Sequence, residues 1–302
     1  MFPSPDHANF RSAAPGDHSE TFVPRIWHWL LGTVVIVVVW QVGGVALILG
    51  AADFFNVPVE DLETFPDVAP WKAAVITLVS FIPLFLVVPL LYLLLLRTRV
   101  KELITSHQKI SPLRIWHGFL AMTALIVPLT AIDLFLNGDE YRYSFDWAIF
   151  WPYLIVALTL LPIQTTAEEF FFRGWLLRWN SSGRWPIWAV VALNSSLFAL
   201  PHMLNPEVKD FYLLAFLYFT SMGAMLTLAT LRDKSLELAI GAHFANNLIA
   251  GILVSYQDSA LPSAALFMSG ELDWLASTVT AIIMVPLFLL LTRPRKQPHE
   301  IK

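Results

Sequence analysis

Long apolar runs separated by short polar segments recur along the chain and dominate its hydrophobic pattern. Runs of this length with almost no charge predict helices that cross the hydrocarbon core of a membrane, which is about 30 Å thick. Trp and Tyr gather near the ends of these runs, as in the aromatic belts at membrane surfaces. The pattern therefore predicts an all-α, polytopic transmembrane helical bundle of about eight spans. We expect spans at about 26–51, 71–96, 115–136, 148–179, 186–203, 211–231, 235–256 and 274–292.

The two ends of the chain differ from this pattern. Residues 1–24 are polar and have no apolar period, so they predict a disordered N-terminal tail. They do not resemble a signal peptide, because no basic segment opens them and no small-residue cleavage site follows the first apolar run. Residues 25–293 are expected to form one membrane-embedded helical domain, and residues 294–302 a C-terminal tail. No internal repeat is visible.

Composition agrees with a membrane protein. The 302 residues are 57% hydrophobic and 14% charged, with a mean hydropathy of +0.63, which is far too apolar for a soluble enzyme of this size. The chain has no cysteine, so disulfides, thiolate metal sites and cysteine nucleophiles are all excluded.

The basic residues indicate the orientation. All but three of the 19 Lys and Arg residues fall in segments that the eight-span arrangement places on one side. The exceptions are Lys72, Arg142 and Lys209, whereas the 53–67 loop on the opposite side is rich in acid. Because basic loops stay in the cytoplasm, both termini are expected to be cytoplasmic. We expect a multi-pass integral protein of the cell (plasma or inner) membrane.

The charged residues Glu168, Glu169 and Arg173 lie in the interior of the fourth apolar segment, which continues from 146 to 179 without a strong stop. Each charge there costs roughly 2.5–3.5 kcal/mol on insertion scales, so such groups pair, line a wet cavity or take part in chemistry. Glu169 and Arg173 are four residues apart, in the order that favours an ion pair on a helix. Glu168 lies about 100° further round and has no local partner. A purely structural network of the three is the alternative.

Two later spans carry further polar residues. The fifth ends at Pro201-His202, and the seventh contains His243 and Asn247, which share one helical face. At about 1.5 Å per residue, His243, Glu168 and His202 lie roughly 12, 16 and 24 Å below the cytoplasmic surface. These depths do not coincide, so tilt or a broken helix must bring the groups together. Each histidine alone is most often structural, but the cluster indicates a site.

Three motifs carry a resemblance to a known family: Glu168-Glu169-x-x-x-Arg173, Phe198-x-x-x-His202 and His243-x-x-x-Asn247. In this order they resemble the CPBP family of CAAX prenyl endopeptidases and bacteriocin-processing or self-immunity (Abi) proteins, over about 148–256. The resemblance implies an intramembrane endopeptidase that cuts near the C-terminus of a peptide or a membrane-attached, possibly prenylated, protein. It implies that Glu168 and His202 activate water, His243 and Asn247 stabilise the oxyanion, and Glu169 and Arg173 hold the architecture.

The chemistry of the residues agrees with this reading, and alternatives stay open. A carboxylate in surroundings of low polarity is suited to act as a general base. Hydrogen-bond donors on His243 and Asn247 are suited to stabilise an oxyanion. We expect no cofactor; zinc on Glu168, His202 and His243 is the rival, although no HExxH pair is present. A proton or ion relay in a transporter and a non-catalytic immunity protein are non-enzyme alternatives. Catalysis by Ser195 or Ser196 is a further one, but Asn194 and these serines are expected to hydrogen-bond between helices.

Partners follow from the same reading. We expect membrane lipids around the bundle and a peptide or lipidated protein as substrate, and we expect no nucleic acid.

Overall fold

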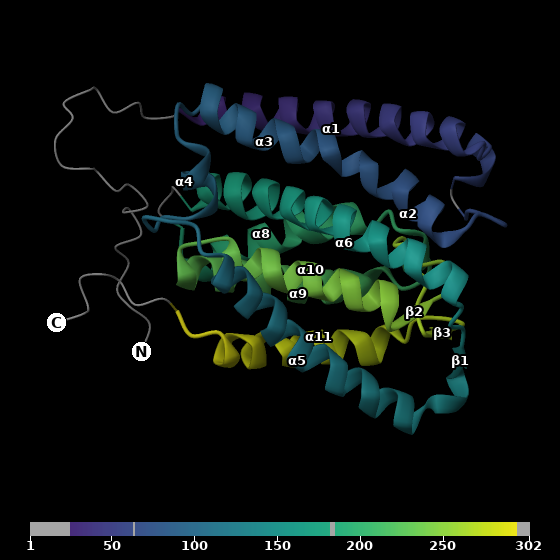
Figure 1. Cartoon of the computed structure of the whole chain (residues 1–302). Helices are drawn as coiled ribbons and strands as arrows, with labels where there is room; N and C mark the ends of the chain where they lie inside the picture. Colours follow the sequence, from purple (N-terminus) through teal and green to yellow (C-terminus); the bar gives the residue numbers. More distant parts are fainter. Residues whose placement is uncertain (1–24, 63, 182–184, 295–302) are drawn as a thin grey trace.

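The chain folds into a bundle of helices that run nearly parallel to one axis, with short strands at one end (Figure 1). The computed structural model describes residues 25–62, 64–181 and 185–294. The expected tail at 1–24 lies outside the described residues, as does 295–302 of the C-terminal tail. The main helices are α1 (Ile26–Phe55), α2 (Pro70–Leu78), α3 (Ile82–Leu94), α4 (Val100–Ile104), α5 (Pro112–Leu136), α6 (Trp147–Glu169), α7 (Leu177–Asn180), α8 (Ile187–His202), α9 (Tyr212–Asp233), α10 (Glu237–Ile252) and α11 (Trp274–Leu291).

The chain is a helical, polytopic membrane protein. Among the described residues, six helical segments are long and apolar enough to cross a membrane. One of them, Pro70–Leu94, combines α2 and α3 through a 3₁₀ turn at Val79–Phe81, and another, Trp147–Asn180, combines α6 and α7. The remaining two predicted spans correspond to α8 and α10, which have 16 residues each and are shorter than a simple crossing requires. The count of eight spans therefore stays a prediction.

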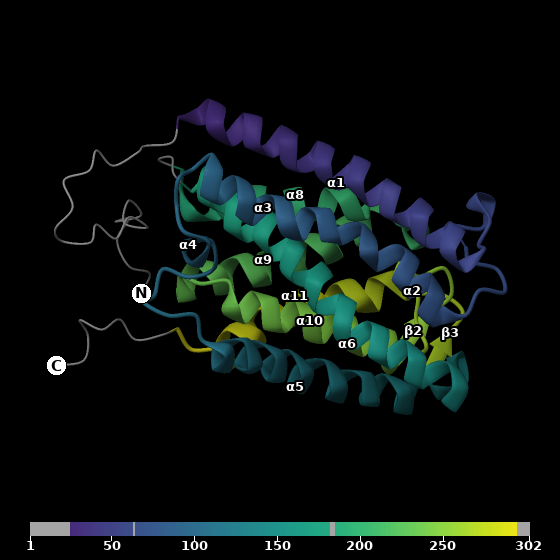
Figure 2. The same ribbon diagram turned by 45° about the horizontal axis from the view of Figure 1, so that its top comes forward.

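The helices form a layered arrangement around the site. α1 and α3 lie side by side along one edge of the bundle, and α5 lies along the opposite edge, with α6, α9 and α10 between them (Figures 1 and 2). Much of α1 is exposed and apolar, as expected for a helix that faces lipid.

α5 and α10 approach each other through glycines. A Cβ on Gly241 would lie 1.9 Å from the Ile115 carbonyl oxygen, and a Cβ on Gly118 would lie 2.2 Å from that of Leu238. Only glycine permits such close backbone contact, so these two residues bring the helices together. The contact fixes α10, which carries His243 and Asn247.

The two ends of the bundle differ in structure and charge. One end holds η3 (Gly138–Glu140), η5 (Pro206–Val208) and a small sheet in the order β1-β3-β2. β1 (Tyr141–Tyr143) is antiparallel to β3 (Phe267–Ser269), which is parallel to β2 (Val254–Tyr256). These three-residue strands were not expected from the sequence. The other end, which we call the basic end, carries Arg97, Arg99, Lys101, Lys109, Arg178, Arg232, Lys234 and Arg293.

Candidate active site

The chain changes its helical geometry directly after the paired glutamates. α6 ends at Glu169 and continues as a π-helical segment, Phe170–Leu176, before α7 begins. Such segments loosen the regular hydrogen-bond ladder and are frequent at functional sites. The Phe172 carbonyl accepts a hydrogen bond from Asn194 Nδ2 at 2.9 Å, and Asn194 Oδ1 accepts one from Thr227 Oγ1 at 2.9 Å. The prediction of hydrogen bonds between helices is confirmed for Asn194. It is wrong for Ser195, whose Oγ is buried without a hydrogen-bond partner among the described residues.

Glu169 and Arg173 form an ion pair that water does not reach. Arg173 Nη1 donates to Glu169 Oε1 at 2.9 Å, and both side chains are fully buried. Arg173 Nη2 also donates to the Gly223 carbonyl at 3.3 Å, while the guanidinium carbon lies 4.2 Å from the centre of the Phe198 ring. These contacts join α6, α8 and α9, so the pair holds three helices around the site.

Glu168 occupies a different position. Its Oε1 accepts a hydrogen bond from Gln164 Nε2 at 2.6 Å, which fixes the carboxylate from one helical turn earlier. Its Oε2 has no hydrogen-bond partner, although Glu168 is only 5% exposed. His243 Nε2 lies 3.5 Å from that oxygen. A buried carboxylate oxygen without a donor is costly, so this atom is available to a water or a substrate.

His243 lies between the two glutamates. Its Nδ1 is 2.8 Å from Glu169 Oε1, and because a carboxylate accepts, Nδ1 is the donor. The ring is thereby oriented with Nε2 toward Glu168.

His202 is held by its own helix. Its Nδ1 donates to the Phe198 carbonyl at 2.9 Å, so its Nε2 keeps a lone pair. The ring packs between Phe198 at 4.7 Å and Phe219 at 4.3 Å, measured between ring centres. Phe198 also contacts the ring of His243 at 5.9 Å, so one aromatic side chain positions both imidazoles.

Asn247 reaches the same site through a residue that sequence reasoning missed. Its Nδ2 donates to Gln164 Oε1 at 3.0 Å, and its Oδ1 accepts from Asn246 Nδ2 at 3.1 Å. One amide hydrogen of Asn247 is therefore free of these bonds. Gln164 is 6% exposed and links Glu168 to Asn247. The available signal was a polar residue four positions before Glu168 in an apolar span.

One cavity of about 450 Å³, which we call the catalytic cavity, brings the four predicted residues together. Its wall includes Glu168, His202, His243 and Asn247, together with Gln164 and Phe198. It extends from Leu226 and Ala242, within the helices, to Leu261 and Trp274, near the sheet.

The donor arrangement does not match a metal site. Within the part of the chain that the structure describes, no group of three His, Cys, Asp or Glu side chains lies close enough to hold a metal ion. Glu169 and His243 Nδ1 are also already joined to each other. The steps proposed below therefore use no metal-bound group.

Comparison with known proteins gives two similarities. Residues 148–249 match the family described as "Type II CAAX prenyl endopeptidase Rce1-like". The chain is also 28% identical to the "Uncharacterized protein YyaK" of Bacillus subtilis (strain 168) over 270 residues, which are 86% of this chain and 89% of that protein. No solved structure matches the chain. The matched segment contains all three motifs and ends just after Asn247.

Proposed function

Because the chain belongs, through residues 148–249, to the Rce1-like family of CAAX prenyl endopeptidases, we propose that it is an intramembrane endopeptidase. In this proposal it hydrolyses a peptide bond near the C-terminus of a peptide or a membrane-attached protein. The observation that carries the proposal is the unpartnered Oε2 of Glu168, which lines a cavity beside two imidazoles and an amide.

The division of roles follows from the contacts of each glutamate. Glu169 Oε1 is bound by Arg173 and lies 2.8 Å from His243 Nδ1. Its Oε2 also has no partner within the described part of the chain, but the side chain is fully buried and does not line the catalytic cavity, so Glu169 is the poorer base. Glu168 has one oxygen held by Gln164 and one oxygen free, which suits a general base that must bind and then release a proton. His202 offers a second acceptor at Nε2, because its Nδ1 donates to Phe198.

The reaction uses these groups in sequence. Glu168 Oε2, aided by His202 Nε2, takes a proton from a water molecule as its oxygen attacks the scissile carbonyl carbon. Negative charge then develops on the carbonyl oxygen. In this proposal His243 carries a proton on both ring nitrogens, so its Nε2–H and the free amide hydrogen of Asn247 donate to that oxygen. Collapse of this intermediate breaks the C–N bond, and the proton held by Glu168 passes to the leaving nitrogen.

The apolar part of the catalytic cavity's wall indicates which type of substrate group lies next to the scissile bond. Its wall includes the apolar residues Met122, Met222, Met225 and Leu226. Methionine side chains adapt their shape to different apolar ligands. The wall therefore supports a substrate with a large apolar side chain or a prenyl group beside the scissile bond.

The experiment is cleavage of quenched fluorescent peptides, with and without a prenyl group, by the purified full chain in lipid nanodiscs. Glu168→Gln should reduce kcat by about 10²–10⁴-fold. Glu60→Gln serves as a matched control, because it makes the same chemical change at an exposed glutamate that lines neither cavity. A Glu168→Gln protein that cleaves as fast as wild type would contradict the proposed base, and a wild-type protein that only binds these peptides would indicate a non-catalytic protein.

A further inference from the structure

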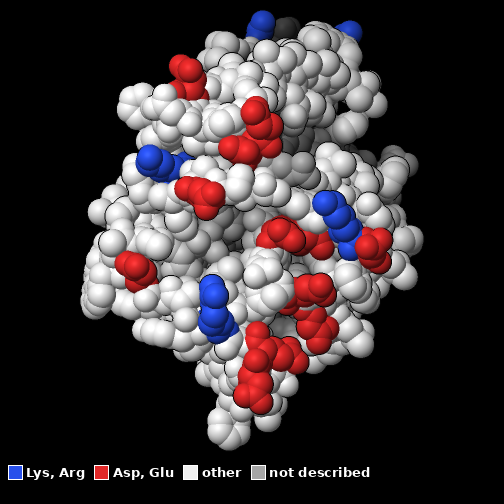
Figure 3. All heavy atoms as spheres, turned by 90° about the vertical axis from the view of Figure 1, so that its right-hand side faces the viewer, with Lys and Arg blue, Asp and Glu red and all other residues white. Residues whose placement is uncertain are grey.

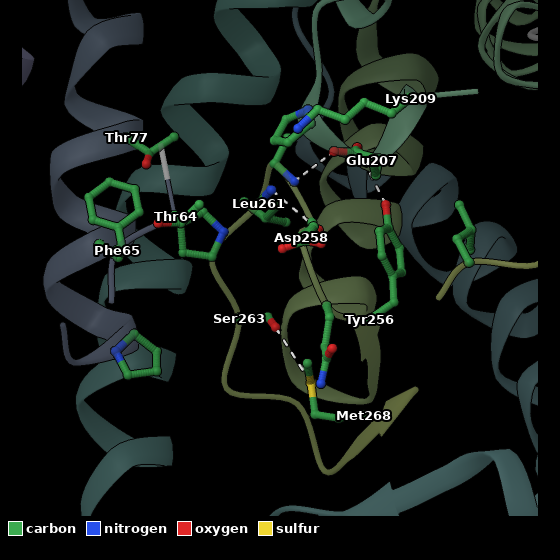
Figure 4. Close-up of a pocket in the computed structure, with 18 of the residues that line it drawn as sticks. Thr64, Phe65, Thr77, Glu207, Lys209, Tyr256, Asp258, Leu261, Ser263 and Met268 are labelled. Carbon is green, nitrogen blue, oxygen red and sulfur yellow. Dashed lines mark hydrogen bonds between the residues drawn. The ribbon is translucent and has the colours of Figure 1, made fainter. Parts of the chain in front are cut away.

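A second cavity of about 750 Å³, which we call the vestibule, lies at the end of the bundle opposite the basic end. Its wall comes from 62–80, 206–211 and 256–274. Figure 4 shows Glu207, Lys209 and Asp258 on this wall, with Tyr256 beside Glu207. The vestibule and the catalytic cavity share part of their walls, so they adjoin. The shared residues are Thr77, Ser80, Glu207, Tyr256, Ser259, Ala260, Leu261, Leu272 and Trp274.

The basic end offers no comparable route. Among the described residues, none that lines the catalytic cavity comes from the connections 95–111, 178–186 or 234–236 at that end. The cavity found there measures about 10 Å³, lies beside Arg173 and Ser235, and shares no lining residue with the catalytic cavity. A space of this size holds about one water molecule, so a peptide cannot pass through it.

The face around the vestibule is acidic. Figure 3 shows acidic side chains spread over this face, with few basic ones among them. Among the described residues, the vestibule wall has one basic residue, Lys209, and four acidic ones: Glu207, Asp210, Asp258 and Glu271. Acidic walls around a hollow raise the local concentration of cations and speed their arrival.

Hydrogen bonds to Glu207 hold together the segments that lie between the two cavities. Its Oε2 accepts from the Ala260 backbone N–H at 2.9 Å, and its Oε1 accepts from Asn205 Nδ2 at 3.0 Å and Tyr256 Oη at 3.4 Å. These bonds hold the 258–261 segment against η5, where both cavities touch it (Figure 4).

We propose that the substrate reaches Glu168 through the vestibule, from the extracytoplasmic side, and that it is a peptide with a positively charged segment outside the membrane. This inference rests on the proposed function. Two independent observations carry it: the acidic vestibule that adjoins the catalytic cavity, and the buried, unpartnered Glu168 Oε2 at which that route ends. The basic loops assign the vestibule to the extracytoplasmic side.

The first test measures charge preference without catalysis. The Glu168→Gln protein in nanodiscs is titrated with a fluorescent lysine-rich apolar peptide and with a matched glutamate-rich peptide. Asp210→Asn combined with Asp258→Asn should weaken binding of the lysine-rich peptide roughly three- to tenfold, and added salt should do the same. Both aspartates have a positive φ, 67° and 59°, which asparagine tolerates. The matched control is Asp139→Asn with Glu140→Gln, an exposed acidic pair outside the vestibule wall. Equal binding of the two peptides, or equal effects of the two double variants, would overturn the charge preference.

The second test measures the route. Since the chain has no cysteine, Ser259→Cys provides a single thiol at the boundary of the two cavities. A bulky, membrane-impermeant maleimide added from the acidic face should then block cleavage and peptide binding. Ser106→Cys, whose position is exposed at the basic end, is the control. When it is labelled from the basic end, it should keep both peptide cleavage and peptide binding.

The outcomes separate the two proposals. Cleavage that persists after complete labelling of Ser259→Cys overturns the route and leaves the endopeptidase in place. Blocked peptide binding in a protein that cleaves nothing supports the route and overturns the endopeptidase.

Discussion

Replacing Glu169 by glutamine tests the assignment of the two glutamates most directly. The change keeps the size of the side chain and one acceptor oxygen, but it removes the charge that balances Arg173. Arg173 is fully buried, and within the described residues its hydrogen bonds go to Glu169 and to the Gly223 carbonyl. The guanidinium would remain in the bundle without its counter-charge.

The expected magnitude follows from measurements on other buried pairs. Removing one partner of a buried ion pair costs about 3–5 kcal/mol. We expect the lower part of this range, about 3 kcal/mol, because glutamine still accepts from Arg173. At about 2–4 °C per kcal/mol this lowers Tm by roughly 6–12 °C. Glu168→Gln should change Tm little, since Glu168 Oε2 has no donor to lose and glutamine keeps an oxygen for Gln164.

The assay is thermal unfolding followed by intrinsic Trp fluorescence, on the same samples whose cleavage is measured. A double variant, Glu169→Leu with Arg173→Met, should recover much of the stability, because a buried pair is often replaced by apolar residues at little cost. The reasoning is refuted by the reverse pattern, in which Glu169→Gln keeps the wild-type Tm and abolishes cleavage while Glu168→Gln is unstable.

Four further expectations concern the metal, the packing, the positioning of the base and the pH dependence. Chelation should leave cleavage unchanged, with no stoichiometric zinc in the sample; loss of activity that zinc restores would make the protein a metalloprotease. Gly241→Ala should destabilise by about 1–3 kcal/mol or more, because its Cβ meets backbone, whereas Gly50→Ala, with no heavy atom within 4 Å, should be neutral or slightly stabilising in a Tm measurement. Gln164→Leu should lower kcat by up to about 100-fold with KM little changed, since Gln164 positions Glu168. A variant with unchanged kcat and a raised KM would contradict this role. Burial raises the pKa of Glu207, so the folded protein binds a proton at this carboxyl more tightly than the unfolded chain does. The free energy of unfolding should therefore fall as pH rises above 4.5, and Glu207→Gln should flatten this dependence. A free energy of unfolding that rises over the same pH range in the wild type would contradict the expectation.

Much of the fold was visible in the sequence because lipid imposes a simple rule. Apolar runs must be helical in a membrane, and the predicted 274–292 and 115–136 spans match α11 and α5 within a few residues. The Glu169–Arg173 spacing likewise predicted a contact that depends only on local helix geometry.

What the sequence did not show depends on contacts between distant segments. The π-helical turn after Glu169 has no pattern of its own, and the link from Gln164 to Asn247 joins two helices. The three-residue strands are too short for an alternating pattern. The vestibule is built from connections whose backbone has no repeating period, so its position next to the catalytic cavity required the fold.

The glycine contact between α5 and α10 also restricts how the protein can move. Helices whose backbones touch at Gly118 and Gly241 cannot slide past one another, so this pair behaves as one rigid body that carries His243. The wall on another side of the cavity, at Thr77–Phe81, instead includes a 3₁₀ turn between α2 and α3, where the regular helical hydrogen bonds are interrupted. Backbone amides of α5 and α10 should consequently exchange with solvent deuterium more slowly than those around this turn.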